Sequence, residues 1–335
     1  MITDARVLQP EFIPTEVKHR DAELNTLSAA LNPITHGDNP DTAFLFGPSG
    51  VGKTCLAKFL VEQLRETVVD LNYQYVNCWE DYSRFKTLYR ILDGINHTFD
   101  VHRQSTPKDV LLERLREYDG SPYIVILDEV DQLEDKQLLY ELYRIRGLTM
   151  ILIANSEQDL FASLDNRLNS RFQVCTRARF NPYGNDALVA ILRDRVRWGL
   201  KSDVVCPDEL RLIADMAAGD ARAAIGILRK AVQTANQSGY NEVSSEVIRG
   251  VVPEAKAEIE QRSLDKLTDH QRVLYDTILD YGEIAPSTLF EIYSEVVENP
   301  KTQRMVRNYL TKLEHYNLII SKGSTKGRTY HPYSP

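Results

Sequence analysis

The sequence has few cysteines, few histidines and no long apolar run in its 335 residues. The cysteines form no CxxC pair, and the seven histidines are dispersed. This scatter argues against a disulfide framework or a zinc site, and is typical of reduced thiols in a cytosolic protein. No apolar run approaches the roughly 20 residues that cross a bilayer, and the first residues carry an acid instead of a signal peptide's apolar stretch. We therefore expect a cytoplasmic protein without a membrane partner. The cysteines are Cys55, Cys78, Cys175 and Cys206.

The total charge is negative, with 40 basic residues against 48 acidic residues and an isoelectric point near 5.5. This balance argues against a surface covered in phosphate-binding basic side chains, although net charge hides a local basic patch. Hydrophobic residues at 43% and charged residues at 26% are globular averages, so disorder is excluded. The length predicts two or three domains, at about 150 residues for each.

Short apolar runs typical of buried parallel strands alternate with helical segments in the first half of the chain. This alternation predicts an α/β domain over residues 1–180. The predicted strands are Thr42–Phe46, Tyr73–Cys78, Tyr123–Leu127, Thr149–Ile153 and Phe172–Cys175.

The strand signals stop after Asn181-Pro182. Helical segments then predict a small all-helical domain over residues 181–255, and the charged stretch up to Lys266 is typical of a linker. Further helical segments and a terminal β-hairpin with a Gly-containing loop predict a last domain over residues 265–335. The helices are predicted over 186–198, 207–217, 220–236, 243–250, 268–281, 286–297 and 302–316.

The segment from Gly47 to Thr54 matches the pattern G-x-x-x-x-G-K-[ST] in full, between a predicted strand and a predicted helix. The glycines let backbone N–H groups surround phosphates, and the helix N-terminus adds its positive dipole end. Lys53 can reach the β- and γ-phosphates, and the Thr54 hydroxyl can bind Mg²⁺. The pattern therefore predicts a site for ATP or ADP with Mg²⁺. The expected contacts are Pro48, Ser49, Gly50, Val51, Gly52, Lys53, Thr54 and Cys55.

Acidic residues follow the predicted strand that ends at Leu127. Ligands of open α/β sheets bind at the carboxyl ends of the strands. We expect Asp128 to hold the magnesium shell and Glu129 to orient and deprotonate the attacking water.

Polar residues further along the chain have two interpretations each. Asn155, after the next strand, could bond the γ-phosphate or the water, but asparagine is also a common turn former. Arg167 and Arg171 lie four apart on a predicted short helix, and one could reach a nucleotide held by a neighbouring subunit. An ordinary pair of surface charges fits the same spacing.

The order of these motifs resembles an AAA+ ATPase. Later segments are similar to one family within it, the archaeal replication initiators related to origin recognition complex subunit 1 and cell division control protein 6. Its winged-helix domain resembles the C-terminal 70 or so residues, so the likeness spans nearly the whole chain. The segments that carry it are Phe12–Glu23, Phe180–Tyr183, Ile191–Arg195, Gly219–Arg222 and Ala223–Arg229.

The resemblance implies roles for individual residues. Asn155 would be a first sensor of the γ-phosphate, and Arg222 a second sensor that reaches it from the helical lid. Arg171, or Arg167, would be the arginine finger. The implied catalytic set is Lys53, Glu129, Asn155, Arg171 and Arg222, and the implied contacts around the base are Val17, His19, Arg20, Tyr183 and Ile191.

The two halves of the last domain have opposite charge. Residues 265–299 carry two basic and eight acidic residues, whereas residues 300–335 carry seven basic residues and one acid. A basic third helix and a basic wing are what a winged helix-turn-helix presents to duplex DNA. A solvated helix or a protein-docking wing would have the same composition. The candidate DNA contacts are Arg304, Arg307, Lys322, Lys326 and Arg328.

The resemblance implies an ATP-dependent initiator, with slow ATP hydrolysis as a switch, in the cytoplasm on the nucleoid. Its implied partners are double-stranded origin DNA, other initiator subunits and the minichromosome maintenance helicase, which it would help to load. The alternative is an AAA+ loader or signalling ATPase whose C-terminal winged helix binds protein instead of DNA. A regulator with a vestigial nucleotide site is disfavoured by the intact Lys53, Asp128 and Glu129.

Overall fold

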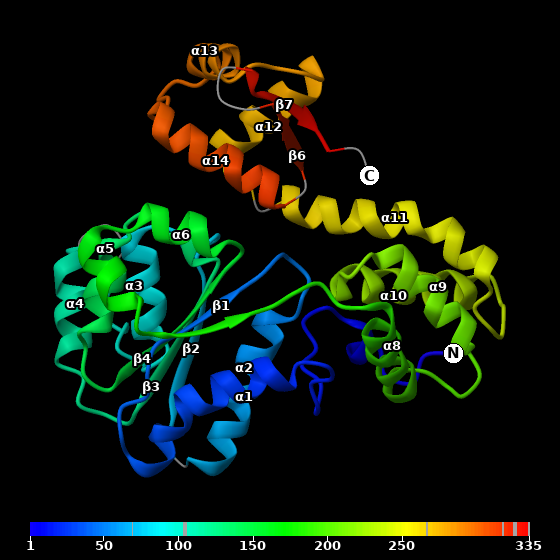
Figure 1. The fold of residues 1–335 in the computed structure, drawn as a ribbon, viewed down its shortest axis with the longest axis horizontal. Coiled ribbons are helices and arrows are strands. Elements are labelled where there is room, and N and C mark those ends of the chain that lie inside the picture. The colour runs from blue at the N-terminus through cyan, green and yellow to red at the C-terminus, as the bar shows by residue number, and fades with distance from the viewer. Residues whose placement is uncertain (69, 103–105, 266, 317, 324–326, 334–335) are drawn as a thin grey trace. The chain divides into compact units, whose positions relative to one another are not determined.

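The computed structural model describes the chain except residues 69, 103–105, 266, 317, 324–326 and 334–335. The described residues form two compact units, Met1–Arg249 and Gly250–Pro335 (Figure 1). Within them, no helix is long and apolar enough to cross a membrane.

A parallel sheet lies at the centre of the first unit (Figure 1). Its strands are β1 (Ala43–Phe46), β2 (Asn72–Asn77), β3 (Tyr123–Asp128), β4 (Leu148–Ala154) and β5 (Thr176–Arg179). The spatial order is β2-β3-β4-β1-β5. β1 and β3 are buried along their whole length, as expected where helices cover both faces of a parallel sheet. This order brings the residues that follow β1, β3 and β4 to one edge.

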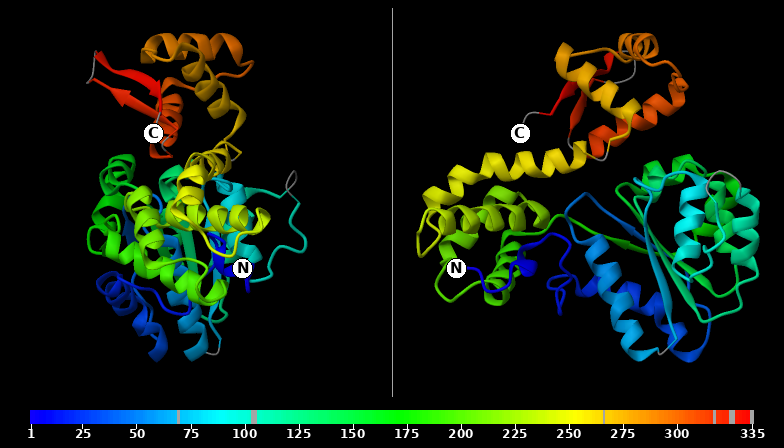
Figure 2. Two further views of the ribbon diagram at one scale, coloured as in Figure 1. Left: turned by 90° about the vertical axis from the view of Figure 1, so that its right-hand side faces the viewer. Right: turned by 180° about the vertical axis from the view of Figure 1, so that it is seen from behind.

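Helices cover both faces of this sheet (Figure 2). They are α1 (Asp21–Leu31) and α2 (Lys53–Thr67) on one face, and α3 (Arg84–Asp93), α4 (Lys108–Arg116), α5 (Gln137–Tyr143), α6 (Glu157–Ser163) and α7 (Asn166–Phe172) on the other. Successive side chains of a strand point to opposite faces. Leu45 and Ile126 therefore join the core under α1 and α2, whereas Phe44 and Leu127 join the core under α3 to α7.

The strand predicted at Phe172–Cys175 is wrong. Phe172 ends α7, a helix that begins where the Asp165 carboxylate accepts the Leu168 N–H at 2.8 Å. The strand that pairs with β1 begins only at Thr176. It is an edge strand in which only Ala178 is buried, so it lacks the apolar run on which the prediction depended.

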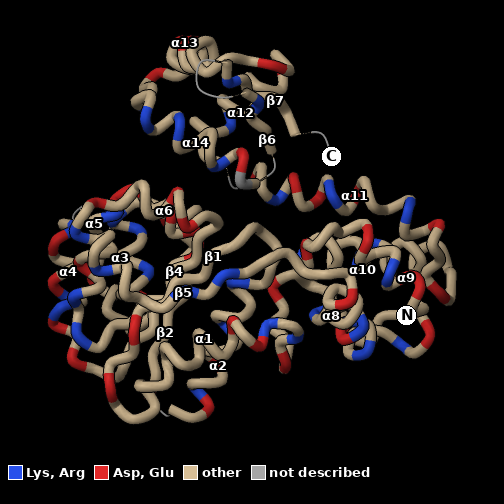
Figure 3. Tube along the Cα trace, viewed as in Figure 1, with Lys and Arg blue, Asp and Glu red and all other residues tan. Residues whose placement is uncertain are grey.

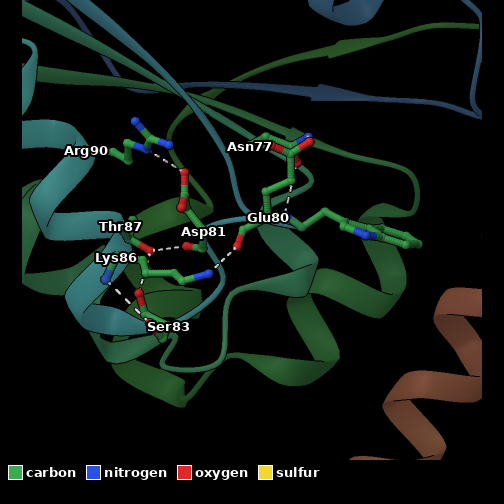
Figure 4. A network of polar contacts seen from close by, with 8 residues as sticks. Asn77, Glu80, Asp81, Ser83, Lys86, Thr87 and Arg90 are labelled. Carbon is green, nitrogen blue, oxygen red and sulfur yellow. Dashed lines mark hydrogen bonds and ion pairs between the residues drawn. The ribbon is translucent and has the colours of Figure 1, made fainter. Parts of the chain in front are cut away.

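The loop between β2 and α3 is held by side chains (Figure 4). The Asn77 Oδ1 accepts the Trp79 N–H at 3.0 Å, and the Asp81 carboxylate accepts the Arg90 Nε–H at 2.9 Å. The Ser83 hydroxyl accepts a backbone N–H in the first turn of α3. These contacts fix the chain as it leaves the carboxyl end of β2.

The first three helices predicted after β5 are confirmed. They are α8 (Asn185–Gly199), α9 (Pro207–Ala217) and α10 (Ala221–Gln237), and α11 (Ser245–Leu264) follows them. The helix predicted over 243–250 is too short, because α11 continues through most of the segment expected to be a linker, with Pro253 inside it. The charged residues that suggested a linker also suit an exposed helix, where Glu258 and Arg262 form an i,i+4 ion pair.

The second unit has the elements of a winged helix-turn-helix. They are the helices α12 (Asp269–Tyr281), α13 (Pro286–Val296) and α14 (Gln303–His315), and the antiparallel strands β6 (Ile319–Lys322) and β7 (Thr329–Pro332). Ile284 adds a bridge to Tyr330 of β7. Leu274, Leu289 and Leu310 pack together in one core from all three helices. The three predicted helices and the terminal hairpin are thus confirmed.

Candidate functional site

The loop between β1 and α2 has the backbone of a phosphate cradle. Gly50 and Gly52 have φ values of 76° and 90°, which side-chain-bearing residues rarely adopt. A Cβ on Gly50 would collide with the Asp220 carboxylate, and one on Gly52 with the Tyr183 hydroxyl. The loop is therefore shaped by glycine and enclosed by residues from beyond β5. Its amides precede α2, where the helix dipole favours an anion.

Lys53 and Asn155 meet at this loop. Lys53 is 7% exposed, and its Nζ donates to the Pro48 carbonyl at 2.6 Å and to the Asn155 Oδ1 at 3.2 Å. Burial lowers the pKa of Lys53 to about 8, although the nearby Asp128 carboxylate opposes this shift. The structure thus brings Asn155, which follows β4, to the loop. Together these groups could hold the charge of a phosphate.

Asp128 is held by donors from three elements. Its Oδ2 accepts the Thr54 hydroxyl at 2.6 Å and the Tyr75 hydroxyl at 3.0 Å, and its Oδ1 accepts the Glu129 N–H at 2.9 Å. A hydroxyl beside a carboxylate is the oxygen donor set that Mg²⁺ prefers, so Thr54 and Asp128 fit a magnesium ion. No sequence pattern marks Tyr75 as a residue of this site, because its position beside Asp128 depends on the pairing of β2 with β3.

The helices α8, α9 and α10 form a lid, and the start of α10 contacts the cradle. The Asp220 carboxylate caps this helix by accepting the N–H groups of Arg222 and Ala223 at 2.7 and 3.0 Å, a cap worth about 1 kcal/mol. The Arg222 guanidinium donates to the Ser49 hydroxyl at 3.3 Å. The Ala221 N–H donates to the Gly50 carbonyl at 3.0 Å. Arg222 therefore lies at the cradle.

Arg20 fastens the segment before α1 to the cradle. It is 6% exposed and donates to the carbonyls of Val51 and Asn181 at 3.0 and 2.6 Å. Its guanidinium lies 4.0 Å from the centroid of the Tyr183 ring, and Glu23 forms an ion pair with it at 2.8 Å. These contacts give Arg20 a positioning role. Of the other residues expected near the base, Val17 and Ile191 are half-buried and His19 is exposed.

A second buried arginine, Arg195 of α8, holds the N-terminal segment against the lid. Its guanidinium donates to the carbonyls of Val7 and Phe12 at 2.6 and 3.1 Å and covers the Phe12 ring at 4.8 Å. Arg195 was noted only as part of the family resemblance, because its partners lie more than 180 residues away in the sequence. The lid and the segment that leads to Arg20 are thereby joined.

Arg167 and Arg171 are both exposed on α7. The Arg171 guanidinium lies 5.1 Å from the centroid of the Tyr140 ring of α5. No hydrogen bond or ion pair among the described residues joins either arginine to the cradle. The structure therefore separates both from the groups around Lys53, and leaves the choice between them open.

Basic residues lie along α14 in the second unit (Figure 3). Arg304 and Arg307 are exposed, while Val306, Leu310 and Leu313 form a buried stripe. In the hairpin, Lys322 and Arg328 are exposed, and Lys326 lies outside the described residues. The acidic residues of α12 and α13 are exposed as well. They are Asp269, Asp276, Asp280, Glu291 and Glu295.

Family models and curated relatives match the chain. A model described as a Cdc6 AAA+ ATPase-type lid domain matches residues 189–252, and one described as an AAA domain matches residues 37–162. ORC1-type DNA replication protein 1 of Halobacterium salinarum is 62% identical over 308 residues, which cover 92% of this chain and 100% of the relative. ORC1-type DNA replication protein 9 of the same organism is 46% identical over 330 residues, 98% and 93% of the two chains.

Solved structures match in fold over the whole chain. The Aeropyrum pernix ORC1 protein in complex with DNA has a TM-score of 0.75 at 27% identity, covering 100% of this chain and 94% of that one. The Aeropyrum pernix ORC2 protein, in ADPNP–ADP complexes, has a TM-score of 0.68 at 23% identity, covering 99% and 94%. The parallel α/β domain with a helical lid is therefore a fold that this chain shares with both.

Proposed function

The chain belongs to the family of ORC1-type DNA replication proteins, and from this membership we propose that it is an ATP-dependent initiator that binds double-stranded origin DNA. We propose further that it helps to load the minichromosome maintenance helicase, together with other initiator subunits on the DNA. The AAA domain and lid are those of a nucleotide-binding ATPase. The observation that carries the DNA part of the proposal is the exposed basic face of α14 in a unit whose other half is acidic.

In the proposed ATPase reaction, each residue around the cradle has a separate task. Lys53 binds the β- and γ-phosphates, and Asn155, which contacts the Lys53 amine, orients the attacking water. Glu129 accepts a proton from that water. Thr54 and Asp128 would hold Mg²⁺, which neutralises charge on the phosphates when it is bound. Arg222 reaches the γ-phosphate from the lid.

The contacts between lid and cradle support a switch between nucleotide states. The Ala221 N–H and the Arg222 guanidinium bond to Gly50 and Ser49, so a phosphate that enters or leaves the cradle changes the groups that hold α10. The Arg195 contacts carry the same change to the N-terminal segment. We propose that slow hydrolysis sets how long the lid stays in its ATP-bound position.

Arg171 is the proposed finger, acting on a nucleotide bound by a neighbouring subunit. Its replacement by alanine should leave ATP affinity intact and lower only the hydrolysis that depends on assembly. The loss should be roughly 10- to 100-fold, the worth of one charge-assisted hydrogen bond. When this variant is mixed with the Glu129→Gln variant, turnover should return at one kind of interface. There the nucleotide is bound by an Arg171→Ala subunit, which keeps Glu129, and the neighbouring Glu129→Gln subunit supplies Arg171. The measurement is the ATPase rate of mixed assemblies.

Arg167→Ala on the same helix is the matched control, and it should retain assembly-dependent hydrolysis. Assemblies that form without any restored turnover would contradict the role of Arg171. In that case the finger would be Arg167, or hydrolysis would take place within one subunit without a finger from its neighbour.

DNA binding is tested by recovery of genomic DNA fragments on the full-length chain, with ATP and with ADP. The wild-type protein should enrich a few discrete loci, to different extents with the two nucleotides. The Arg304→Ala/Arg307→Ala double variant should lose this enrichment, because it removes two exposed cations from α14. Recovery of DNA fragments uniformly from the whole genome would contradict origin binding. Recovery of no DNA would favour the alternative in which this unit binds protein.

The salt dependence of affinity separates the two kinds of contact. An arginine on a phosphate should, when removed, lower the log–log salt slope by about 0.9 and weaken all sequences alike. An arginine that reads guanine should cost about 1–3 kcal/mol on the preferred site only. Arg272→Ala is the control, because this exposed arginine lies in the acidic half and pairs with Asp276 at 3.3 Å. Its slope should equal that of the wild-type protein.

A further inference from the structure

We propose that Tyr75 is a positioning residue for magnesium binding, because its hydroxyl holds the Asp128 carboxylate in the orientation that receives the metal's shell. This inference rests on the proposed nucleotide function and adds to it a residue that no motif marks. Tyr75 lies in β2, whereas the motifs lie after β1, β3 and β4.

The strand register places Tyr75 beside Asp128. In the pairing of β2 with β3, Tyr75 lies opposite Ile126 and Asn77 lies opposite Asp128. Residues two apart on a strand share a face, so the Tyr75 side chain lies on the same face of the sheet as that of Asn77. From there its hydroxyl donates to the Asp128 Oδ2 at 3.0 Å. The network after β2 shown in Figure 4 holds the carboxyl end of this strand.

The hydrogen bonds around Asp128 restrict its rotation. An ionised carboxylate has about four lone-pair sites. Within the described part of the chain, Tyr75 and Thr54 donate to Oδ2 and the Glu129 N–H donates to Oδ1. Any rotation of the carboxylate breaks at least one of these bonds. Loss of the Tyr75 hydroxyl leaves Oδ2 bound only to Thr54, whose own oxygen is expected to face the metal.

Lys58 covers the ring of Tyr75. Its Nζ lies 3.6 Å from the centroid of that ring, a cation–π contact that helps to hold the ring in place. Lys58 follows Thr54 by four residues on α2 and so lies on the same face of that helix.

The chain contains a matched control for Tyr75. Tyr73 lies two residues earlier on the same face of β2, and it is also half-buried. The Arg65 guanidinium lies 5.2 Å from the centroid of its ring. Burial, followed by a hydrogen bond to the Glu62 carboxylate, raises the pKa of Tyr73. Tyr73 therefore has the same kinds of neighbour, but its carboxylate partner is not one of the proposed magnesium ligands.

The test measures how strongly Mg²⁺ improves nucleotide binding by the full-length chain. A fluorescent ATP analogue is titrated in Mg²⁺ and in EDTA, with wild-type protein, Tyr75→Phe and Tyr73→Phe. In Tyr75→Phe, the ratio of affinity in Mg²⁺ to affinity in EDTA should fall about tenfold, the usual effect of losing a hydrogen bond to a metal ligand. Its affinity in EDTA should remain that of the wild-type protein. Tyr73→Phe should keep the wild-type ratio.

Each other outcome overturns the proposal. An unchanged ratio in Tyr75→Phe means that Asp128 does not need the hydroxyl. Equal losses in both variants mean that β2 packing matters and the hydrogen bond to Asp128 does not. Both changes remove one hydroxyl from a half-buried ring, and thermal unfolding without nucleotide checks that each variant is folded. Failure of the proposed function is distinct, because the wild-type protein itself would then bind no nucleotide, or bind it without regard to Mg²⁺.

Discussion

Replacement of Glu129 by glutamine should slow ATP hydrolysis about 10²- to 10⁴-fold and leave ATP affinity unchanged. The amide keeps the shape of the side chain but cannot accept the proton of the attacking water. Glu129 has φ 55° and ψ 44°, a left-handed conformation that a residue other than glycine rarely adopts. Its N–H bonds to the Asp128 carboxylate in this conformation. Such strain is typical of functional sites, because the surrounding structure must maintain it.

Single-turnover hydrolysis and equilibrium binding of ATP measure the two effects separately. Asp131→Asn is the matched control, since it neutralises a half-buried acid only two residues further along the chain. It should hydrolyse ATP at close to the wild-type rate. If Glu129→Gln lost ATP affinity as severely as a Lys53 variant does, the proposed division of tasks between the two residues would be refuted.

Replacement of Lys53 by methionine should weaken ATP binding about 10²- to 10⁴-fold. The ammonium is expected to make two charge-assisted hydrogen bonds to phosphate oxygens, each worth about 1.5–3 kcal/mol. The Lys53 Nζ donates to backbone carbonyls of the cradle and to the Asn155 Oδ1. A phosphate would therefore meet an amine that is already in place. Isothermal titration of the full-length chain with ATP measures the loss.

The pH dependence of wild-type binding tests the same group. Burial lowers the pKa of Lys53 to about 8, so the free protein loses this charge as the pH rises through that value. Only the protonated amine attracts phosphate, so ATP binding takes up a proton above pH 8. Affinity should then fall by up to tenfold for each pH unit. In Lys53→Met, this fall should disappear.

Lys136 provides the control for burial alone. Its pKa is also lowered to about 8 by burial, and its Nζ donates to the carbonyl of Asp131 at 2.8 Å. Lys136→Met should keep both the wild-type ATP affinity at neutral pH and its fall above pH 8. If the fall above pH 8 disappeared in Lys136→Met and remained in Lys53→Met, the group that titrates would be Lys136, which would contradict the prediction.

Local patterns of the sequence were sufficient for the elements that carry most of the site. The β1 strand, the glycine loop and α2 follow one another within 25 residues, and the apolar run of β3 leads directly to Asp128. The buried stripe of α14 follows from its helical spacing. These features are set by propensity, spacing and backbone geometry over a few residues, so the sequence predicts them without knowledge of the rest of the chain.

Only the tertiary structure decided which distant groups meet. Asn155 is a common turn residue until β4 is placed next to β1, where its side chain bonds to Lys53 across 102 positions of sequence. In the sequence, Tyr75 is an ordinary aromatic residue of a strand, and only the pairing of β2 with β3 places it beside Asp128. The strand β5 has too few buried residues to be predicted from the sequence, and it is recognised only by its pairing with β1. The sequence by itself thus determined the motifs and most of the elements that carry them. The order of the strands determined the partners, because hydrogen bonds between segments depend on three-dimensional pairing that no local pattern encodes.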